Sequence, residues 1–171
     1  MRRRALLGLL ASAGLPAVPG CGFELRRTAE MPFATIALTG FAPRSPLADE
    51  LRRTLGSRVS VVDSPAKADV VLHVLLERRE RSVVASTAAA QVREMQLRLL
   101  FNFQLTNAGG RELAPLTELL LVRDMTYAET FAQGKAQEEE LLFAAMQTDI
   151  VQQVTRRLAQ VKLQAARPAS S

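Results

Sequence analysis

The sequence predicts an α+β fold of two layers, in which two helices cover one face of a mixed β-sheet of long strands. A strand, a helix and a strand follow one another near the N-terminus, which is typical of a βαβ unit. A long segment then alternates apolar and polar residues, as a strand of an antiparallel meander does. The last long segment has an apolar stripe at helical spacing, which predicts a helix that covers the sheet.

The βαβ unit is predicted between Phe33 and Asp63. Apolar and β-branched residues from Phe33 to Phe41 are typical of a strand. A helix is predicted after Ser45, with a proline in its first turn and Gly56 at its end, and its leucines recur at every fourth position. The segment "VSVVD" is the second strand. Such a connection predicts that the two strands are parallel.

Three long antiparallel strands are predicted between Ser64 and Tyr127. The middle strand, Val92 to Leu105, has apolar residues at every second position, and five of the six residues between them are polar. The glycines of "TNAGGRE" predict a hairpin turn before the third strand, Leu116 to Tyr127. At about 3.3 Å per residue the middle strand spans roughly 45 Å, which predicts an elongated body unless bulges divide the strands.

The segment from Ala136 to Leu163 predicts one strong helix. Its apolar stripe consists of Phe143, Met146, Ile150, Val154, Leu158 and Val161. Three glutamates, Glu138 to Glu140, lie at the predicted start, and basic residues lie at the end. The helix dipole favours this arrangement, so these charges require no ligand to explain them.

Residues 1–20 predict a signal peptide that is removed. Three arginines precede an apolar run that is too short to span a membrane and that ends in small residues. The order of these features is typical of general secretion, and "RRRALLGLL" only hints at twin-arginine export, because the rest of that pattern is missing. Removal lowers the formal net charge from +5 to +2, because Arg2, Arg3 and Arg4 are lost and no acidic residue is. A nearly neutral body with one tyrosine and no tryptophan does not predict nucleic-acid binding.

Cys21 is the only cysteine, and it follows Val18-Pro19-Gly20, a stretch that resembles the lipobox of bacterial lipoproteins. The resemblance implies that Cys21 becomes the first residue and carries N-palmitoyl and S-diacylglycerol groups, which suffice for stable anchoring. Gly22 in the next position implies sorting to the outer membrane. The alternative is a secretory signal beside an incidental thiol. The predicted organisation is a lipidated tether over residues 21–32, one domain over 33–162 and a disordered tail over 163–171.

No enzyme site is predicted. His73 is the only histidine and lies in the apolar segment "VVLHVLL", so metal sites and Cys-His or Ser-His-Asp arrangements lack partner residues. A hydrolase built on His73 is the one enzyme hypothesis to test. The glycines of "NAGGRE" lack the lysine of a phosphate-binding loop, and no cofactor is predicted.

The segment "ERRER" allows two interpretations. On a regular strand Arg79 and Arg81 share one face, while Arg78 and Glu80 share the other. Mixed charges of this kind are common on a solvated strand. Alternatively, Arg79, Arg81 and Arg93 form a patch that binds an anionic ligand, because guanidinium groups match the geometry of phosphate.

The chain resembles the LptE family of LPS-assembly lipoproteins over almost the whole mature sequence. The segments that carry the resemblance are "CGFELR" at Cys21, "SPLADELRRTL", "VREMQLRLLFNFQL" and "KAQEEELLFAAMQTDIVQQVTRRL". The resemblance implies a non-enzymatic lipoprotein of the Gram-negative outer membrane. It further implies that the protein faces the periplasm, plugs the lumen of an LptD-type β-barrel and helps deliver lipopolysaccharide to the outer leaflet.

The resemblance also implies that basic residues bind lipopolysaccharide. The family's lysine in the short loop before the final helix corresponds to Lys135 in "GKAQEEE". The second basic position falls in the hairpin before "VREMQ", where this chain has "STAAAQ", so Arg93 is the nearest replacement. Lys135, Arg93, Arg79 and Arg81 are therefore the candidate ligand residues. A different function, a stand-alone lipoprotein that binds anionic lipid for an envelope transport system, would use the three arginines alone.

Overall fold

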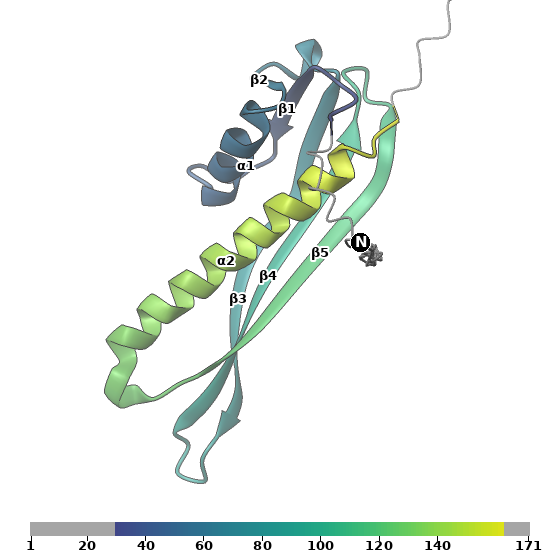
Figure 1. Cartoon of the computed structure of the whole chain (residues 1–171). Helices are drawn as coiled ribbons and strands as arrows, with labels where there is room; N and C mark the ends of the chain where they lie inside the picture. Colours follow the sequence, from purple (N-terminus) through teal and green to yellow (C-terminus); the bar gives the residue numbers. More distant parts are fainter. Residues whose placement is uncertain (1–29, 163–171) are drawn as a thin grey trace, which may run out of the picture.

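The computed structural model describes residues 30–162, which form five strands and two long helices (Figure 1). In chain order the elements are β1 (Thr35–Thr39), α1 (Pro46–Gly56), β2 (Ser60–Val62), η1 (Pro65–Lys67), β3 (Val70–Ser86), β4 (Val92–Thr106), β5 (Glu112–Thr126), η2 (Glu129–Phe131) and α2 (Ala132–Leu158). The predicted signal peptide, the predicted lipidation at Cys21 and the predicted tail over 163–171 lie outside the described residues. Neither α1 nor α2 is both long enough and apolar enough to cross a membrane.

The predicted α+β architecture is confirmed. The strands are ordered β2-β1-β3-β4-β5, with β1 parallel to β2 and β3, and with β3, β4 and β5 antiparallel to one another. The βαβ unit and the meander therefore belong to one mixed sheet. Figure 1 shows an elongated body, in which the long strands extend from the end that carries β1, β2 and α1 to the tip of the β3–β4 hairpin. Both helices lie on the same face of the sheet.

Local hydrogen bonds determine where α1 begins. The Ser45 hydroxyl accepts a hydrogen bond from the Ala48 amide at 3.1 Å, so it caps the first turn, and Pro46 occupies a position that needs no donor. The same hydroxyl lies 2.8 and 2.9 Å from the two carboxylate oxygens of Glu77 on β3. The predicted leucine stripe of α1 is buried. The cap and the stripe together hold α1 against the sheet.

The alternation in β4 divides the sheet into two faces. Leu97, Leu99, Phe101, Phe103 and Leu105 are all buried beneath the helices, as predicted. The residues between them lie on the opposite face, which neither α1 nor α2 covers. Register shifts at Val74/Leu76 and Phe103/Leu105 bend the strands without dividing them, so β3 keeps 17 residues and β4 keeps 15. The predicted elongated shape is confirmed for this reason.

Helix α2 ends at Leu158 and buries five of the six residues of the predicted stripe, while the sixth, Val161, is buried just beyond the helix. The helix also buries Gln147, Val151 and Thr155. The buried strip is wider than predicted because α1 packs beside α2, where Thr148 donates a hydrogen bond to Glu50 at 2.8 Å. The predicted start of α2 is wrong. The helix begins at Ala132, because the single Gly134 costs only about 1 kcal/mol and no proline interrupts the segment. No acidic residue therefore lies in its first turn.

A second, smaller cluster covers the opposite face at one end of the sheet. Ala37, Ala68 and Val71 are buried there, because the connection through η1 crosses over β1. The Asp69 carboxylate fixes this crossing by accepting hydrogen bonds from the Thr35 amide and hydroxyl at 2.9 Å and from the Ala34 amide at 3.0 Å. These bonds stabilise the charged carboxylate, those from Thr35 most, and they hold the pKa of Asp69 below its ordinary value.

Gly40 follows β1 at a point where the backbone of β3 comes very close. Its φ is +80°, and an added Cβ would overlap the Val74 carbonyl oxygen. We expect Gly40→Ala to lower the free energy of unfolding by about 2 kcal/mol or more, from backbone strain and the forced displacement of β3. Gly56→Ala is the control, because no atom lies within 4 Å of the added Cβ and alanine favours the helix. Urea denaturation that found the two variants equally stable would contradict this account.

Candidate functional site

Arg79 and Arg81 lie on β3 and face α2. The Nη1 atom of Arg79 donates to Glu140 at 3.2 Å, and its guanidinium carbon lies 4.9 Å from the centroid of the Phe143 ring. Arg81 pairs with Glu139 at 3.5 Å. Both arginines are therefore held by α2 in this conformation, and an anionic ligand at this position has to replace carboxylates.

The other charges of the same segment lie on the face that no helix covers. Arg78 and Glu80 form an ion pair there at 2.8 Å. The predicted division of "ERRER" between two faces is thus confirmed. The glutamates of α2, which the sequence assigned to the helix dipole, instead contribute two of the ion pairs that join α2 to β3.

Lys135 lies in the first turn of α2, whereas the sequence placed it in a loop before the helix. Its ammonium group donates to Glu138 at 2.7 Å and to the Thr126 hydroxyl at 3.2 Å, and only 19% of its side chain is exposed. The earlier start of α2 explains this difference. Lys135 therefore fastens the beginning of α2 to the end of β5.

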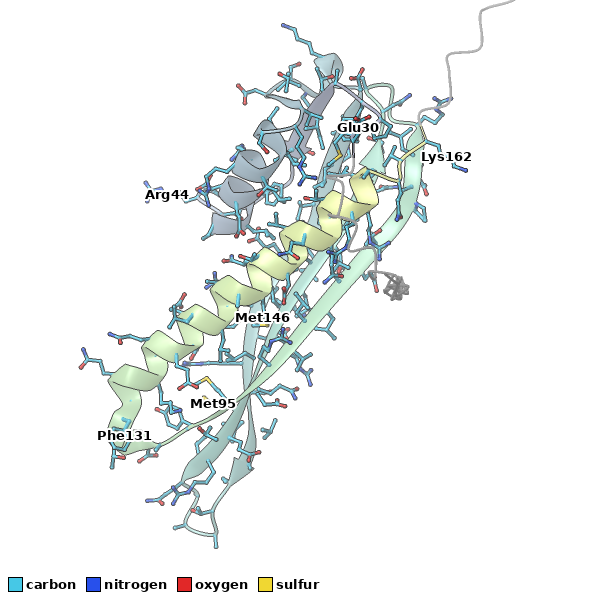
Figure 2. All side chains as sticks on the ribbon, in the orientation of Figure 1. Glu30, Arg44, Met95, Phe131, Met146 and Lys162 are labelled. Atoms are coloured by element: carbon cyan, nitrogen blue, oxygen red, sulfur yellow. The ribbon has the colours of Figure 1, made fainter. Side chains whose placement is uncertain are left out.

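Arg93 lies at the start of β4, directly after the hairpin that contains "STAAAQ". Its side chain is exposed and donates to the Gln91 side chain at 3.4 Å. The Tyr127 amide donates to the Arg93 carbonyl at 2.8 Å, one residue beyond the Thr126 that Lys135 contacts. The fold therefore brings Arg93 and Lys135 to the same end of the sheet, the end where Figure 2 labels Met95 and Phe131.

We call the uncovered side of β3, β4 and β5 the open face. The register aligns Arg78, Leu100 and Leu120 across the three strands. Leu120 is 59% exposed, and the neighbouring positions carry Arg98 and Asn102. Arg98 donates to the Gln96 side chain at 2.7 and 2.9 Å, and Gln96 donates to Asp124 at 3.0 Å. The open face thus combines a hydrogen-bonded polar network with exposed leucine.

Sequence reasoning identified the polar character of the open face and missed its apolar part. The run "ELLLV" gives no periodicity that assigns a face to Leu120. Only the register with β4 shows that Leu119 and Leu121 turn toward α2 while Leu120 turns away. The alternation of β4 could have assigned Leu120 to a face, but only if the register between β4 and β5 had been known.

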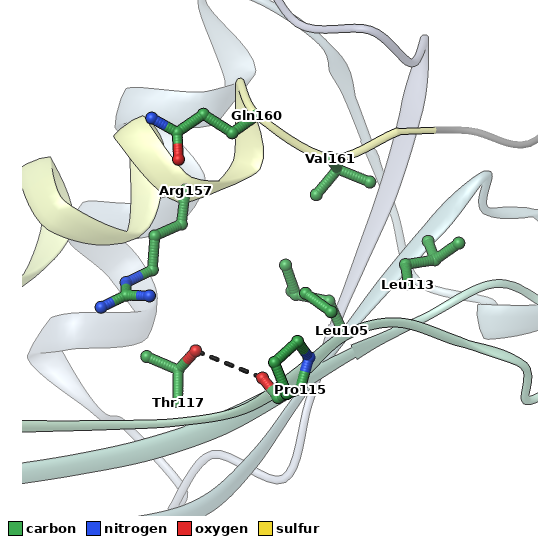
Figure 3. A pocket seen from close by; sticks show the side chains of 8 residues that line it. Leu105, Leu113, Pro115, Thr117, Arg157, Gln160 and Val161 are labelled. Carbon is green, nitrogen blue, oxygen red and sulfur yellow. Dashed lines mark hydrogen bonds between the residues drawn. The ribbon is translucent and has the colours of Figure 1, made fainter.

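A cavity of about 200 Å³ lies between the end of α2 and the β4–β5 hairpin (Figure 3). Its lining is mostly apolar, with Arg157 and Gln160 from the helix side and with Thr117 donating to the Pro115 carbonyl at 3.3 Å. Ligand pockets usually enclose about 300–1,000 Å³. The cavity is smaller than a usual ligand pocket and its lining is mostly apolar, so we interpret it as imperfect packing at the end of α2.

His73 has a structural setting. Its Nδ1 atom lies 2.7 Å from the Thr39 hydroxyl, and the ring is half-buried on the uncovered face of the sheet. Its cross-strand neighbour is Gln104, and no carboxylate is its hydrogen-bond partner among the described residues. Within residues 30–162 no three potential ligands of the His, Cys, Asp and Glu types gather in a way that could hold a metal ion.

Comparison with known proteins identifies the family. The family model described as LptE, lipopolysaccharide-assembly, matches residues 33–158. This chain belongs to the LptE family. The resemblance noted from the sequence is thus confirmed, and with it the assignment to non-enzymatic lipopolysaccharide-assembly lipoproteins. Membership is consistent with an outer-membrane location.

Relatives of known sequence or structure extend over most of the chain. The LPS-assembly lipoprotein LptE of Yersinia enterocolitica is 30% identical over 162 residues, which are 92% of this chain and 77% of the relative. That of Pectobacterium atrosepticum is 28% identical, with 91% and 86% covered. Lipoprotein B from Nitrosomonas europaea is 30% identical in sequence to this chain. Its solution structure superposes with a TM-score of 0.70, and the match covers 81% of this chain and 90% of lipoprotein B. The described domain therefore shares its fold with lipoprotein B from Nitrosomonas europaea.

The pair between Arg79 and Glu140 can be measured by a double-mutant cycle. We expect Arg79→Ala and Glu140→Ala to show a coupling energy below about 1 kcal/mol that falls further in 1 M salt, because the pair is solvent-accessible. The same cycle on Arg78 and Glu80, an ion pair within β3 that does not involve α2, is the control. A larger coupling that salt does not reduce would mean that α2 holds Arg79 too firmly for ligand exchange.

Proposed function

We propose that this protein is an outer-membrane lipoprotein that occupies the lumen of an LptD-type β-barrel and helps deliver lipopolysaccharide to the outer leaflet. The observation that carries the proposal is the open face, a long sheet surface with polar side chains that neither α1 nor α2 covers, in a chain of the LptE family. The lumen of a transmembrane barrel is polar, so hydrogen-bonding side chains suit it.

The length of the sheet supports the same proposal. Strands β4 and β5 contain 15 residues each, which extend over roughly 50 Å at about 3.3 Å per residue. The hydrocarbon core of a bilayer is about 30 Å thick. A sheet of this length can therefore contact a barrel wall over the whole height of the membrane.

The predicted anchor agrees with this placement. If Cys21 is lipidated, the segment from Cys21 to Pro32 extends to at most about 40 Å, so the domain stays close to the membrane surface. The packed part begins at the end of this segment, where Met31 contacts the core. We propose a lipid-anchored protein on the periplasmic side that enters the partner barrel from there.

We further propose that basic residues contact the phosphates of lipopolysaccharide. Lys135 and Arg93 lie at one end of the sheet, where a phosphorylated headgroup can replace Glu138 and Gln91 as their partners. Arg79 and Arg81 lie farther along β3 and exchange Glu140 and Glu139 for phosphate. Guanidinium groups bind phosphate in a bidentate manner, and the exposed ion pairs they would give up are weak.

Co-purification tests the barrel complex and the face that makes it. We expect the tagged full-length lipoprotein to recover an LptD-type barrel from detergent-solubilised outer membranes, identified by mass spectrometry. Leu120→Arg should lower this recovery about tenfold or more, because it places a new charge on the open face. The matched control is Leu141→Arg on α2, since Leu141 is 72% exposed and Leu120 is 59% exposed. If the wild-type protein is recovered as a monomer, the proposed barrel complex is wrong. If only Leu141→Arg lowers the recovery of the barrel, the open face is not the surface that binds it.

Binding of labelled lipopolysaccharide to the purified lipoprotein tests the ligand residues. We expect Lys135→Ala combined with Arg93→Ala, and Arg79→Ala combined with Arg81→Ala, each to weaken binding about tenfold, because charged hydrogen bonds are lost. Arg52→Ala combined with Arg53→Ala on α1 removes the same charge elsewhere and is the control. Equal loss in all three variants would indicate a general charge effect. Loss only with the Arg79 and Arg81 variant, in a protein that recovers no barrel, would support the stand-alone lipid-binding function.

A further inference from the structure

The two edges of the sheet differ in length. Strand β2 ends the sheet on one side with three residues, whereas β5 ends it on the other with 15. No described residue forms a strand beyond β5. Soluble proteins commonly shorten, bend or block their edge strands, because unpaired backbone groups bind other strands. The β5 edge is therefore the longer of the two backbone surfaces available for pairing.

The register identifies the backbone groups of β5 that point outward. The Tyr127 amide donates to the Arg93 carbonyl, which makes this a hydrogen-bonded pair of the antiparallel ladder. The same register continues without a shift from Thr126 to Thr117. Every second residue therefore directs its amide and carbonyl away from β4. These residues are Glu118, Leu120, Val122, Asp124 and Thr126.

A side-chain contact agrees with this assignment. The Val122 carbonyl accepts a hydrogen bond from the Arg123 guanidinium at 3.2 Å, so it points away from β4. Arg123 also pairs with Asp149 at 3.1 Å and is 46% exposed. Proline and register shifts interrupt β5 only near the hairpin turn, around Pro115. A partner strand has to replace the Arg123 guanidinium at the Val122 carbonyl. From Leu116 to Thr126 the edge contains no proline and no shift.

The side chains along this edge indicate what pairs with it. On the open face they run Glu118, Leu120, Val122 and Asp124, so two apolar residues stand between two acidic ones. Asp124 accepts one hydrogen bond from Gln96, and Glu118 has no ion-pair partner among residues 30–162. A complementary strand has apolar residues at two alternate positions and a lysine or arginine two residues beyond each of them.

We propose that the β5 edge from Glu118 to Thr126 binds an extended, basic segment of the partner barrel as a sixth strand. The proposal rests on the proposed function, since it specifies how that complex is made. The wall strands of a closed barrel have no free edge, so the segment comes from a loop or a terminal part of the barrel protein. Backbone hydrogen bonds provide affinity, and the alternating side chains provide selectivity.

Proline substitutions test the backbone contact without breaking the sheet. Glu118→Pro combined with Val122→Pro removes two outward amides that do not bond to β4. The matched control is Glu118→Ala combined with Val122→Ala, which removes the side chains and keeps the amides. We expect the proline variant to recover at least about tenfold less barrel than the alanine variant from solubilised outer membranes, with thermal unfolding midpoints within a few degrees of each other. Equal recovery would overturn the edge proposal and leave the barrel complex standing. No barrel with the wild type would overturn the proposed function itself.

Photo-crosslinking tests the same contact if the proline variant does not fold. The photo-crosslinking residue p-benzoylphenylalanine replaces Asp124 on the edge, or Thr54 on α1 as the control, in the full-length lipoprotein. We expect the Asp124 position to crosslink to a loop or terminal segment of the barrel with alternating apolar and basic residues. Crosslinks to a wall strand, to a second copy of this chain or to no protein would overturn the proposal.

Discussion

The packing of α2 against the buried side of β4 is the contact on which the rest of the structure depends. Phe101 and Phe103 on β4 are fully buried, with ring centroids 5.5 Å apart, and they lie in one core with Met146 and Ile150 of α2. Burying a large apolar side chain contributes about 1.5–3 kcal/mol. This core holds one long helix across three long strands, and it leaves the opposite face of those strands uncovered.

Both proposed interaction surfaces follow from that asymmetry. Because both helices lie on one face, the polar network of Arg98, Gln96 and Asp124 remains accessible on the other. Because β5 follows β4 and the chain then turns back into α2, no later strand within residues 30–162 covers the β5 edge. The open face and the edge meet along Leu120 and Asp124, so a partner that binds one contacts the other.

Much of the architecture was predictable, because β4 and α2 have unambiguous periods in the sequence. The start of α2 was not, since the resemblance placed Lys135 in a loop before the helix, whereas Lys135 lies in the first turn and donates to Thr126. The face of Leu120 depends on pairing between strands distant in sequence. Arg79 could be placed on a face but not paired, because its partner Glu140 is 61 residues away and meets it only in the folded domain.

The proposed ligand residues and the proposed docking edge are joined at Thr126. Lys135 donates to the Thr126 hydroxyl, and the backbone of Thr126 ends the outward row of β5. A phosphate that draws the Lys135 ammonium away removes one of the bonds between the start of α2 and the end of β5. A strand paired to that edge holds Thr126 in place from the other side. In the two proposals, ligand binding and strand docking act on the same residue, and any coupling between them is reciprocal in free energy.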